Sequence, residues 1–347
     1  MEKPFDYLVF IGRFQPFHIG HYDVVTQALE LSERVILVLG SHNRARDPKN
    51  PFTTSERIEI IKSGLSNLPD QDRNRVFYAP QVDHPYNEDR WISDVQASVQ
   101  TVIHNQPWTP DSIKIGIIGY DKDHSSYYLK KFPAWELVNI APKHPDIHAT
   151  DIRDQLFGDK EGIDFTVNNK HLYTIEEISR KIYPRINEEL SFIKKYKQQW
   201  ASAPYPVTFV TVDSVVTQGG HILLVERGAM PGEGLWALPG GYLDTRETLK
   251  QSSLRELKEE TKIDVPLPVL AGSVVKQKTY DYPSRSLRGR IITECFHYRL
   301  NENYELPKIK GSDDARKAFW LPFADVVRNR HQFFEDHYDI IEDMIGL

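Results

Sequence analysis

The chain has 347 residues, which is enough for about two domains of ordinary size. Hydrophobic residues make up 40% of it and charged residues 27%, a balance that excludes a disordered or fibrous chain. The formal net charge of −6 argues against a general nucleic-acid coat, although it leaves room for a local basic site that binds phosphates.

The sequence also predicts the cellular compartment of the protein. It has no run of about 18 apolar residues, so no membrane-spanning helix is expected. Its first residues lack the basic start, apolar core and cleavage site of a secretory signal. The single cysteine, Cys295, can form neither an intrachain disulfide nor a thiolate metal cluster, which fits a reducing compartment. We therefore expect a cytoplasmic enzyme with small-molecule partners, with neither nucleic acid nor membrane as a partner, and a homo-oligomer remains possible.

The first part of the chain alternates apolar runs with helical patterns. The runs predict an α/β fold whose parallel sheet is covered by helices on both faces. Strands are expected at 7–11, 34–39, 76–79 and 113–118, with a weaker fifth at 135–140, and helices at 22–32, 53–66, 88–104 and 124–132. Thr53 and Glu56 form a capping-box pattern. In such sheets ligands bind beyond the carboxyl ends of the strands, so we look first after Ile11, Leu39 and Ile118.

The pattern changes after residue 155. Apolar positions at helical spacing predict a helical connector over 156–203, formed by two helices or by one helix bent at Pro184. The Pro-containing stretch 203–206 predicts a boundary. From 204 to 347 an α+β domain is expected, with strands at 207–216, 221–225, 270–277, 291–300 and 318–321 and two helices near 246–260 and 332–345.

The first candidate site is the string Gly12-Arg-Phe-Gln-Pro-Phe-His-Ile-Gly-His21, between the first strand and the first helix. Gly12 lets the backbone approach a ligand, and the helix N-terminus directs amide groups and a positive dipole toward it. His18 and His21 add donors for the charge that develops on a transferring phosphoryl group. The string therefore predicts a phosphate site rather than a turn with two solvated histidines.

This string resembles the HIGH-motif nucleotidyltransferases, and its longer form is similar to nicotinamide mononucleotide (NMN) adenylyltransferases of the archaeal type. Residues 50–57 (NPFTTSER) and 147–153 (IHATDIR) match two further motifs of that group. The chain keeps Thr150 and Arg153, but it has His148 and Ala149 where the family has small polar residues. The resemblance covers nearly all of 1–155 and implies a Rossmann-like nucleotidyltransferase domain.

The resemblance also implies the chemistry. The 5′-phosphate of NMN would attack the α-phosphorus of ATP, with a metal such as Mg²⁺ bridging the phosphates. His18, His21 and Arg153 would bind the triphosphate and the transition state. Substrate contacts are expected from Gly12, Arg13, Phe14, Arg57, Trp91, Asp121 and Thr150, and less firmly from Arg44, Arg46 and Lys122. Trp91 would stack on the nicotinamide ring or else belong to the core. Another phosphate acceptor in place of NMN is the alternative.

The second candidate site is a set of carboxylates at helical spacing. Glu256, Glu259 and Glu260 lie at i, i+3 and i+4, so a helix places all three on one face. Such crowding suits a hard cation such as Mg²⁺ together with substrate phosphates. Leu249, Leu254 and Leu257 would anchor the helix on its core side.

With Gly241, Glu247 and Arg255 in register, this stretch resembles the Nudix box. The family's last glycine is replaced by Lys262, which predicts a different helix cap. The resemblance implies that the three glutamates hold metal, that Arg255 ties Glu247 in place and that Arg227 contacts a phosphate. Glu294, Asp313 and Asp314 are candidates for the general base.

The two halves together resemble the bacterial bifunctional NMN adenylyltransferase/Nudix hydrolases. That family implies substrates ATP, NMN, NAD and ADP-ribose, with Mg²⁺, or alternatively Mn²⁺, in both domains. The second half would then cleave ADP-ribose to AMP and ribose 5-phosphate. Two alternatives stay open for it: a different nucleoside diphosphate derivative as substrate, or a sensor that binds ADP-ribose without cleaving it.

Overall fold

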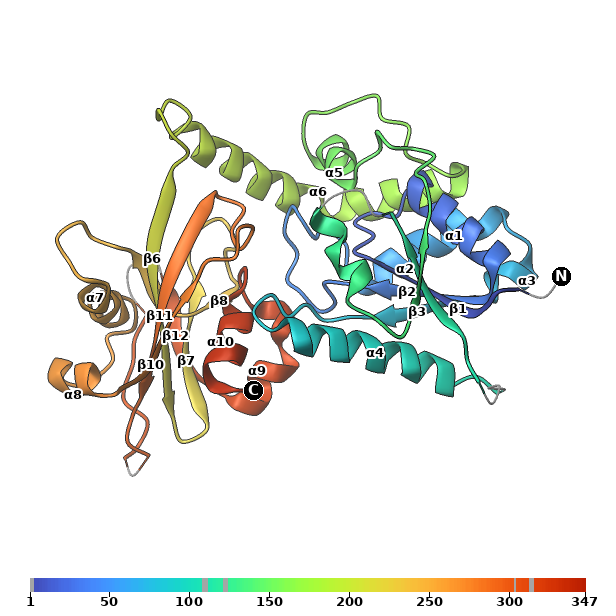
Figure 1. Ribbon diagram of the computed structural model, residues 1–347. Helices are drawn as coiled ribbons and strands as arrows, with labels where there is room; N and C mark the ends of the chain where they lie inside the picture. The colour runs from blue at the N-terminus through green and yellow to red at the C-terminus, as the bar shows by residue number, and fades with distance from the viewer. Residues whose placement is uncertain (1–2, 108–111, 121–123, 303, 312–314) are drawn as a thin grey trace. The chain divides into compact units, whose positions relative to one another are not determined.

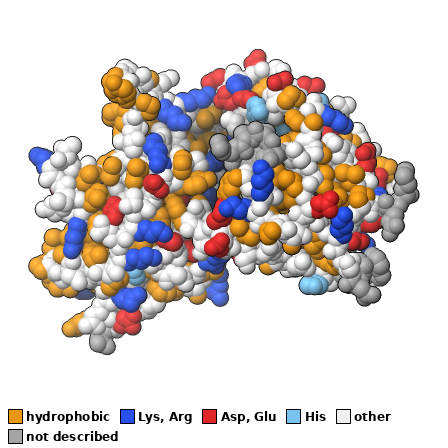
Figure 2. Space-filling view, in the orientation of Figure 1, with side chains coloured by type: hydrophobic (Ala, Val, Ile, Leu, Met, Phe, Trp, Pro, Cys, Tyr) orange, Lys and Arg blue, Asp and Glu red, His pale blue; other side chains and the backbone are white. Residues whose placement is uncertain are grey.

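The computed structural model describes residues 3–107, 112–120, 124–302, 304–311 and 315–347 (Figure 1). It divides into two compact units, the first ending at Asn187 and the second beginning at Glu188. Among the described helices, none combines the length and the apolar character needed to cross a membrane. On the face drawn in Figure 2, basic and acidic side chains are interspersed.

The first unit contains a five-stranded parallel sheet in the order β3-β2-β1-β4-β5. The strands are β1 (Phe5–Gly12), β2 (Ser32–Leu39), β3 (Val76–Pro80), β4 (Ile115–Gly119) and β5 (Glu136–Asn139). Their apolar runs are buried because helices cover both faces. The parallel sheet and its fifth strand are confirmed.

The helices of this unit include the four that were expected, one of them as a 3₁₀ helix, and also α3 and α5, which the sequence did not predict. They are α1 (Ile19–Leu31), α2 (Thr54–Gly64), α3 (Asp70–Arg73), α4 (Glu88–His104) and α5 (Ala149–Phe157), with short 3₁₀ turns at Leu65–Asn67 (η1) and His124–Lys130 (η2). α4 covers one face of the sheet, and α1 and α2 cover the other (Figure 1). The capping box at Thr53 and Glu56 is present in both directions. The helix expected at 124–132 is the 3₁₀ helix η2.

The strand order reverses between β1 and β4. The connections through α1 and α2 lead from β1 to β2 and β3, whereas the connection through α4 returns to the other side of β1. The carboxyl ends of β1 and β4 therefore border a crevice that no crossover helix fills. Two of the three loops singled out from the sequence, those after Ile11 and Ile118, lie at this point.

The connector forms a single helix, α6 (Asn169–Gln198), which includes Pro184. Its early turns bury Ile175, Ile178 and Ile186 in the first unit. Its last turns, from Glu188 onward, belong to the second unit. The expected connector is therefore shared between the two units.

The second unit contains a mixed sheet in the order β10-β11-β6-β7-β12, in which β9 also pairs with β6 and β8 with β7. Only the β6–β11 pair is parallel among the described pairs. The strands are β6 (Thr208–Gln218), β7 (His221–Arg227), β8 (Trp236–Ala237), β9 (Gly240–Tyr242), β10 (Val274–Tyr280), β11 (Arg290–Arg299) and β12 (Ala315–Pro322).

This unit has more helical segments than the two that were expected. They are α7 (Leu249–Thr261), α8 (Leu267–Gly272), α9 (Phe323–Arg328), η3 (Arg330–Gln332) and α10 (His337–Ile345). The strand expected to begin at Leu270 begins only at Val274, because α8 follows Pro266. A short apolar run does not by itself distinguish a strand from a buried helical turn, and a proline favours the start of a helix.

The packing of α7 is the feature that positions the second site. Leu254 and Leu257 join a buried cluster with Val216, Leu223 and Phe296 of the sheet. Because these anchors fix the inner face of α7, its carboxylates are directed away from this cluster. The helix ends at Lys262, which adopts the left-handed conformation (φ 45°) that a glycine favours. The sequence predicted a different helix cap at this position. The structure instead has the left-handed cap that a glycine would form, and a lysine adopts it.

Candidate active sites

The crevice at the ends of β1 and β4 is a cavity of about 560 Å³. Two chain segments that are far apart in the sequence form much of its lining. The first motif contributes Gly12, Arg13, Phe14, Gln15, His18 and His21, and the segment 142–153 contributes His144, His148, Thr150 and Arg153. The fold thus brings the first and third predicted motifs into one site.

His18 and His21 lie at the start of α1 with their ring centroids 3.8 Å apart. His18 is 8% exposed, and its Nδ1 atom has no hydrogen-bond partner in the described part of the chain. Burial holds the pKa of His18 well below its usual value, and the nearby His21, His171 and His148 lower it further. His18 is therefore a neutral imidazole at pH 7 that can hydrogen-bond a bound phosphate.

Arg153 reaches the same crevice from α5. Its Nη1 donates to the Gln15 carbonyl oxygen at 2.7 Å and its Nη2 donates to the Thr150 hydroxyl at 3.1 Å. Burial lowers its pKa to about 10, so the guanidinium stays charged near pH 7. A buried cation beside the neutral imidazole of His18 favours an anionic ligand.

Gln15 joins the first motif to the second. Its side-chain amide donates to the carbonyl oxygen of Phe52 at 2.8 Å and accepts from the Phe52 amide at 3.0 Å. Its backbone carbonyl receives Arg153. The sequence shows Gln15 only as one residue of the first motif, since neither partner is near it in the chain.

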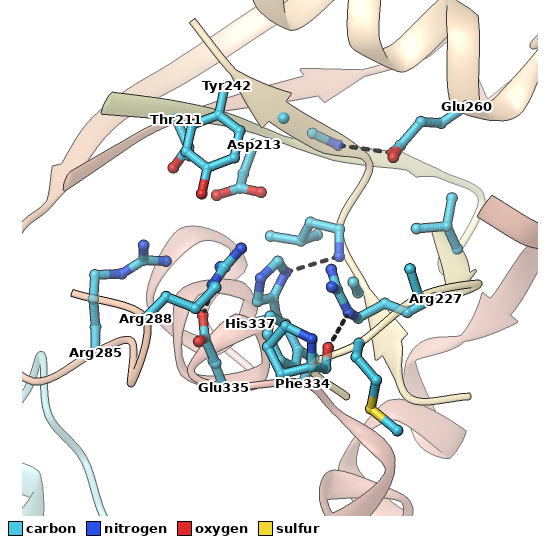
Figure 3. A pocket seen from close by; sticks show the side chains of 18 of the residues that line it. Thr211, Asp213, Arg227, Tyr242, Glu260, Arg285, Arg288, Phe334, Glu335 and His337 are labelled. Carbon is cyan, nitrogen blue, oxygen red and sulfur yellow. Dashed lines mark hydrogen bonds and ion pairs between the residues drawn. The ribbon is translucent and has the colours of Figure 1, made fainter. Parts of the chain in front are cut away.

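The second site is a cavity of about 270 Å³ in the second unit (Figure 3). Glu260 enters it from α7, and Gly240 donates its amide to Glu260 Oε2 at 3.0 Å. Burial raises the pKa of Glu260 to about 8, the Gly240 hydrogen bond opposes this, and the nearby Glu256 and Asp213 raise the pKa further. A buried carboxyl group beside two other acids is a place where a cation would be stabilised.

Arg255 holds the other box carboxylates. Its Nε donates to Glu247 at 2.9 Å, and its Nη1 donates to Glu256 at 2.8 Å and to Glu259 at 2.9 Å. Within the described ranges, no group of three or more His, Cys, Asp or Glu side chains is arranged to hold a metal ion. Arg255 thus occupies carboxylate oxygens that a cation would use.

Gly241 explains why the box begins with a glycine. A Cβ atom there would lie 2.6 Å from the carboxylate of Glu256. The backbone at Gly241 therefore lies close to that carboxylate, and a side chain at this position would displace the Glu256 carboxylate.

The opposite wall of this cavity carries basic groups. The Arg227 guanidinium lies 4.0 Å from the centroid of the Phe334 ring, and its Nε donates to the Pro231 carbonyl oxygen at 3.0 Å. Arg288 lies near the same ring and is paired with Glu335. His337 Nδ1 accepts the Leu238 amide hydrogen at 2.9 Å. Figure 3 shows Glu260 and Asp213 on one side and Arg227 and Arg288 on the other.

Known proteins match both halves of the chain. Residues 9–155 match the cytidylyltransferase-like family model, and residues 207–344 match the NUDIX domain model. A nicotinamide/nicotinic acid mononucleotide adenylyltransferase of Acinetobacter baylyi is 39% identical over 156 residues, which are 45% of this chain and 78% of that protein. An ADP-ribose pyrophosphatase of Methanocaldococcus jannaschii is 33% identical over 134 residues, 39% of this chain and 71% of that protein.

A solved structure matches the whole chain. The bifunctional NMN adenylyltransferase/ADP ribose pyrophosphatase of Francisella tularensis, crystallised with AMP and a manganese ion, aligns with a TM-score of 0.90. It is 33% identical, and the match covers 99% of each chain. This chain belongs to the family of bifunctional NMN adenylyltransferase/ADP-ribose pyrophosphatases. The family expected from the two motifs is confirmed, and we refer below to an adenylyltransferase domain and a Nudix domain.

In the adenylyltransferase domain, the guanidinium of Arg57, a predicted phosphate contact, is hydrogen-bonded to backbone carbonyl oxygens of the chain. Arg57 is 1% exposed, and its Nη1 donates to the carbonyl oxygens of Arg13 at 2.6 Å and Gly40 at 2.7 Å. Its guanidinium thus ties together the loops after β1 and β2. Arg46 likewise pairs with Glu56, and Arg44 lies 3.8 Å from Asp83.

Trp91 packs where the core interpretation of the sequence expected it. It is partly buried against the core of the sheet, with its ring centroid 5.9 Å from that of Phe132 and 6.3 Å from that of Tyr128. It does not appear in the described lining of the crevice. Asp121 and Lys122 lie outside the described residues.

In the Nudix domain, only one of the three candidates for the general base, Glu294, belongs to the described residues. Glu294 is buried and accepts a hydrogen bond from Thr279 at 2.6 Å, and it is not among the described residues that line the cavity. Asp313 and Asp314 fall outside the described residues. The sequence did not point to Asp213, Arg288 and His337. They come from β6, the loop before β11 and the first turn of α10, and only the fold brings them to the cavity that Glu260 lines.

Proposed function

We propose that the chain makes NAD from ATP and NMN in its first domain and hydrolyses ADP-ribose to AMP and ribose 5-phosphate in its second. The observation that carries the first activity is the meeting of His18, His21 and Arg153 in one crevice at the strand-order reversal. The observation that carries the second is a cavity with carboxylates on one wall and arginines on the other. The single buried cysteine fits a reducing compartment, and we place the enzyme in the cytoplasm.

In the first reaction an oxygen of the NMN phosphate bonds to the α-phosphorus of ATP, and the bond to the β-phosphate oxygen breaks. Pyrophosphate leaves with the electron pair. Arg153 and the imidazoles of His18 and His21 stabilise the charge on the transferring group, while Gly12, Arg13, Phe14 and Thr150 contact the substrates. Arg57 positions the loops, and Trp91 packs from α4 against the core of the sheet. Because the described lining is basic or neutral, Mg²⁺ would be held chiefly by the substrate phosphates, whose charge it would neutralise.

The first activity is tested by incubating the full chain with ATP, NMN and Mg²⁺ and measuring NAD and pyrophosphate. We expect His18→Ala to lower kcat by roughly 10²-fold to 10³-fold, the effect of losing one preorganised donor. His104→Ala, at an exposed position on α4, is the matched control. If wild type and control make no NAD but transfer the adenylyl group to another phosphate acceptor, that acceptor replaces NMN as the substrate.

In the second reaction a water oxygen bonds to one phosphorus of the diphosphate, the bridging P–O bond breaks and the water loses its protons to solvent. The carboxylates of Glu256, Glu259 and Glu260 would hold the divalent cation, Mg²⁺ or Mn²⁺. Carboxylate oxygens are the ligand type that suits these cations, and Glu260 has only the Gly240 amide among its described hydrogen bonds, whereas Glu256 and Glu259 would have to exchange Arg255 for the cation. When bound, such a cation neutralises diphosphate charge and lowers the pKa of bound water. Arg227 lies on the opposite wall, where it can pair with a phosphate.

The second activity is tested with ADP-ribose and either Mg²⁺ or Mn²⁺, beside Glu256→Gln. Glu305→Gln, an exposed acid away from the cavity lining, is the matched control. We expect wild type and control, but not Glu256→Gln, to form AMP and ribose 5-phosphate. This result would establish that the glutamate face of α7 is required for the hydrolysis. Binding of ADP-ribose without turnover would instead make the domain a sensor. Neither binding nor turnover would point to a different nucleoside diphosphate derivative.

A further inference from the structure

The last turns of α6 form part of the Nudix cavity. Phe192 and Tyr196 line it, although both lie before residue 207, where the match to the NUDIX family model begins. These turns also belong to the second compact unit, which starts at Glu188. The segment that the sequence presents as a connector therefore contributes a wall to the hydrolase site.

A set of aromatic contacts fixes this wall. The hydroxyl groups of Tyr196 and Tyr242 are 2.8 Å apart, and Tyr242 directly follows Gly241 of the box. Phe209 of β6 supports both rings, with centroid distances of 6.0 Å to Tyr196 and 5.8 Å to Tyr242. Trp200 packs edge-on against Phe209 at 5.1 Å. Rings that are held from behind in this way present a preformed surface.

The front of this wall is exposed. Phe192 is 37% exposed and Tyr242 is 42% exposed, although both line a cavity. Large apolar side chains in a concave site gain free energy when a flat apolar group covers them. Aromatic side chains recognise nucleobases by stacking, because every base offers a π-face.

The charged groups occupy the rest of the cavity. Arg227 and Glu260 line it together with the two tyrosines. Arg288 also lines the cavity, and its charge interacts with both tyrosines. A nucleoside diphosphate has the same two parts, a planar base and a charged diphosphate. Phe334 is covered by Arg227 and Arg288, so Phe192, Tyr196 and Tyr242 are the aromatic lining residues left for the base, while the charged groups would meet the diphosphate.

We propose that Phe192 and Tyr196 of α6, together with Tyr242, form the surface on which the adenine ring of the hydrolase substrate stacks. This inference rests on the proposed ADP-ribose hydrolysis and assigns the base end of that substrate. It makes the end of α6 a specificity element of the hydrolase, although the earlier turns of this helix belong to the first unit.

The test measures hydrolysis of ADP-ribose by the full-length protein. We expect Tyr196→Ala and Phe192→Ala each to raise KM by roughly 5-fold to 10-fold, the loss of part of one stacking contact, with kcat changed less than twofold. Tyr196→Phe keeps the ring and loses only the hydroxyl, so its KM should stay within about twofold of wild type. Tyr205→Ala, at a position that is 80% exposed and outside the described lining, is the control.

Product inhibition separates stacking from a general structural effect. AMP contains the base and ribose 5-phosphate does not, so Tyr196→Ala should weaken inhibition by AMP and leave inhibition by ribose 5-phosphate unchanged. The adenylyltransferase activity of the same variant reports whether the chain has folded. Equal weakening of both inhibitors, or an unchanged KM in both alanine variants, would overturn the proposal.

A failure of the hydrolase proposal gives a different result. If the wild type does not cleave ADP-ribose, the wall is tested by calorimetric binding of ADP-ribose to wild type and Tyr196→Ala. Weaker binding by the variant supports the aromatic surface. Equal binding, or no binding to the wild type, rejects it.

Discussion

Lys262 shows how one residue can depart from a motif while the geometry persists. It ends α7 at φ 45°, and its amide donates to the Lys258 carbonyl oxygen at 3.0 Å. A residue with a Cβ atom pays a steric cost in this conformation that glycine avoids. The family's glycine is therefore replaced here without loss of the helix end.

Lys262→Gly should stabilise the Nudix domain. We expect the free energy of unfolding to rise by about 0.5–1 kcal/mol, because the relief of strain exceeds the added backbone entropy of glycine in the unfolded chain. Urea unfolding measures the change. Lys262→Ala, which removes the side chain but keeps Cβ, serves as the control, and equal stabilisation by both variants would contradict the conformational explanation.

His171 on α6 is a second residue whose effect depends on burial. It is fully buried, and its Nδ1 accepts the Val167 amide hydrogen at 3.2 Å. Burial lowers its pKa to about 4, and an interaction with the Phe17 backbone opposes this lowering. Between pH 4 and pH 6.5 the unfolded state therefore binds more protons than the folded state, so the stabilisation is complete above about pH 6.5 and is lost as the pH falls toward 4.

His171→Asn should reduce the sensitivity of the adenylyltransferase domain to acid, since asparagine can accept the same amide hydrogen without titrating. Between pH 7.5 and pH 5, the wild type should lose about 2 kcal/mol more unfolding free energy than the variant. Urea unfolding at the two pH values gives the difference. His104→Asn at an exposed site should behave as wild type, and an unchanged pH dependence in His171→Asn would refute this assignment.

At the scale of elements, α7 is organised by one arginine. Arg255 contacts Glu247, Glu256 and Glu259, so it sets the position of two predicted metal ligands. Groups that orient metal ligands commonly change affinity or activity by 10-fold to 100-fold when they are removed.

Arg255→Ala should therefore lower ADP-ribose hydrolysis by roughly 10-fold to 100-fold and raise the Mn²⁺ concentration required for half-maximal rate. Steady-state kinetics at graded Mn²⁺ concentrations measures both effects. Arg246→Ala is a useful control, since Arg246 is exposed and pairs only with Asp244 among its described ion pairs. If Arg255→Ala needs the same Mn²⁺ concentration as wild type for half-maximal rate, Arg255 does not orient the metal ligands.

Elements differed in how well the sequence predicted them. The apolar runs that became β1 and β2, and the capping box of α2, carry strong local signals, so their positions were predicted closely. Residues 267–272 carry no comparable signal, because a short apolar run fits either a helix or a strand. The sequence left two interpretations of Trp91, a substrate contact and a core residue. Its packing against Phe132, which lies far along the chain, is visible only in the fold.

At the scale of the whole molecule, each described site is built from one unit. The crevice uses residues 10–153 and the Nudix cavity uses residues 192–337. Only α6 has turns in both units. A ligand that binds one site should therefore stabilise chiefly the domain that forms it.

This is tested by calorimetric unfolding of Glu256→Gln, in which hydrolysis should stop, so that ADP-ribose is not consumed during the measurement. With Mn²⁺ and ADP-ribose at about 100 times Kd, the Nudix transition should gain about 2.7 kcal/mol, whereas NAD should shift the adenylyltransferase transition. A single transition that either ligand raises equally would show that α6 couples the domains into one folding unit.

The sequence by itself determined the two domain types, the parallel sheet, the family and the glutamate face of α7. Each depends on residues close together in the chain, where spacing and periodicity carry the information. The tertiary structure decided that Arg57 ties loops together, that Gln15 joins three motifs, and that α6 contributes an aromatic wall to the hydrolase cavity. These features depend on contacts between residues far apart in the chain, and only packing brings such residues within reach of one another.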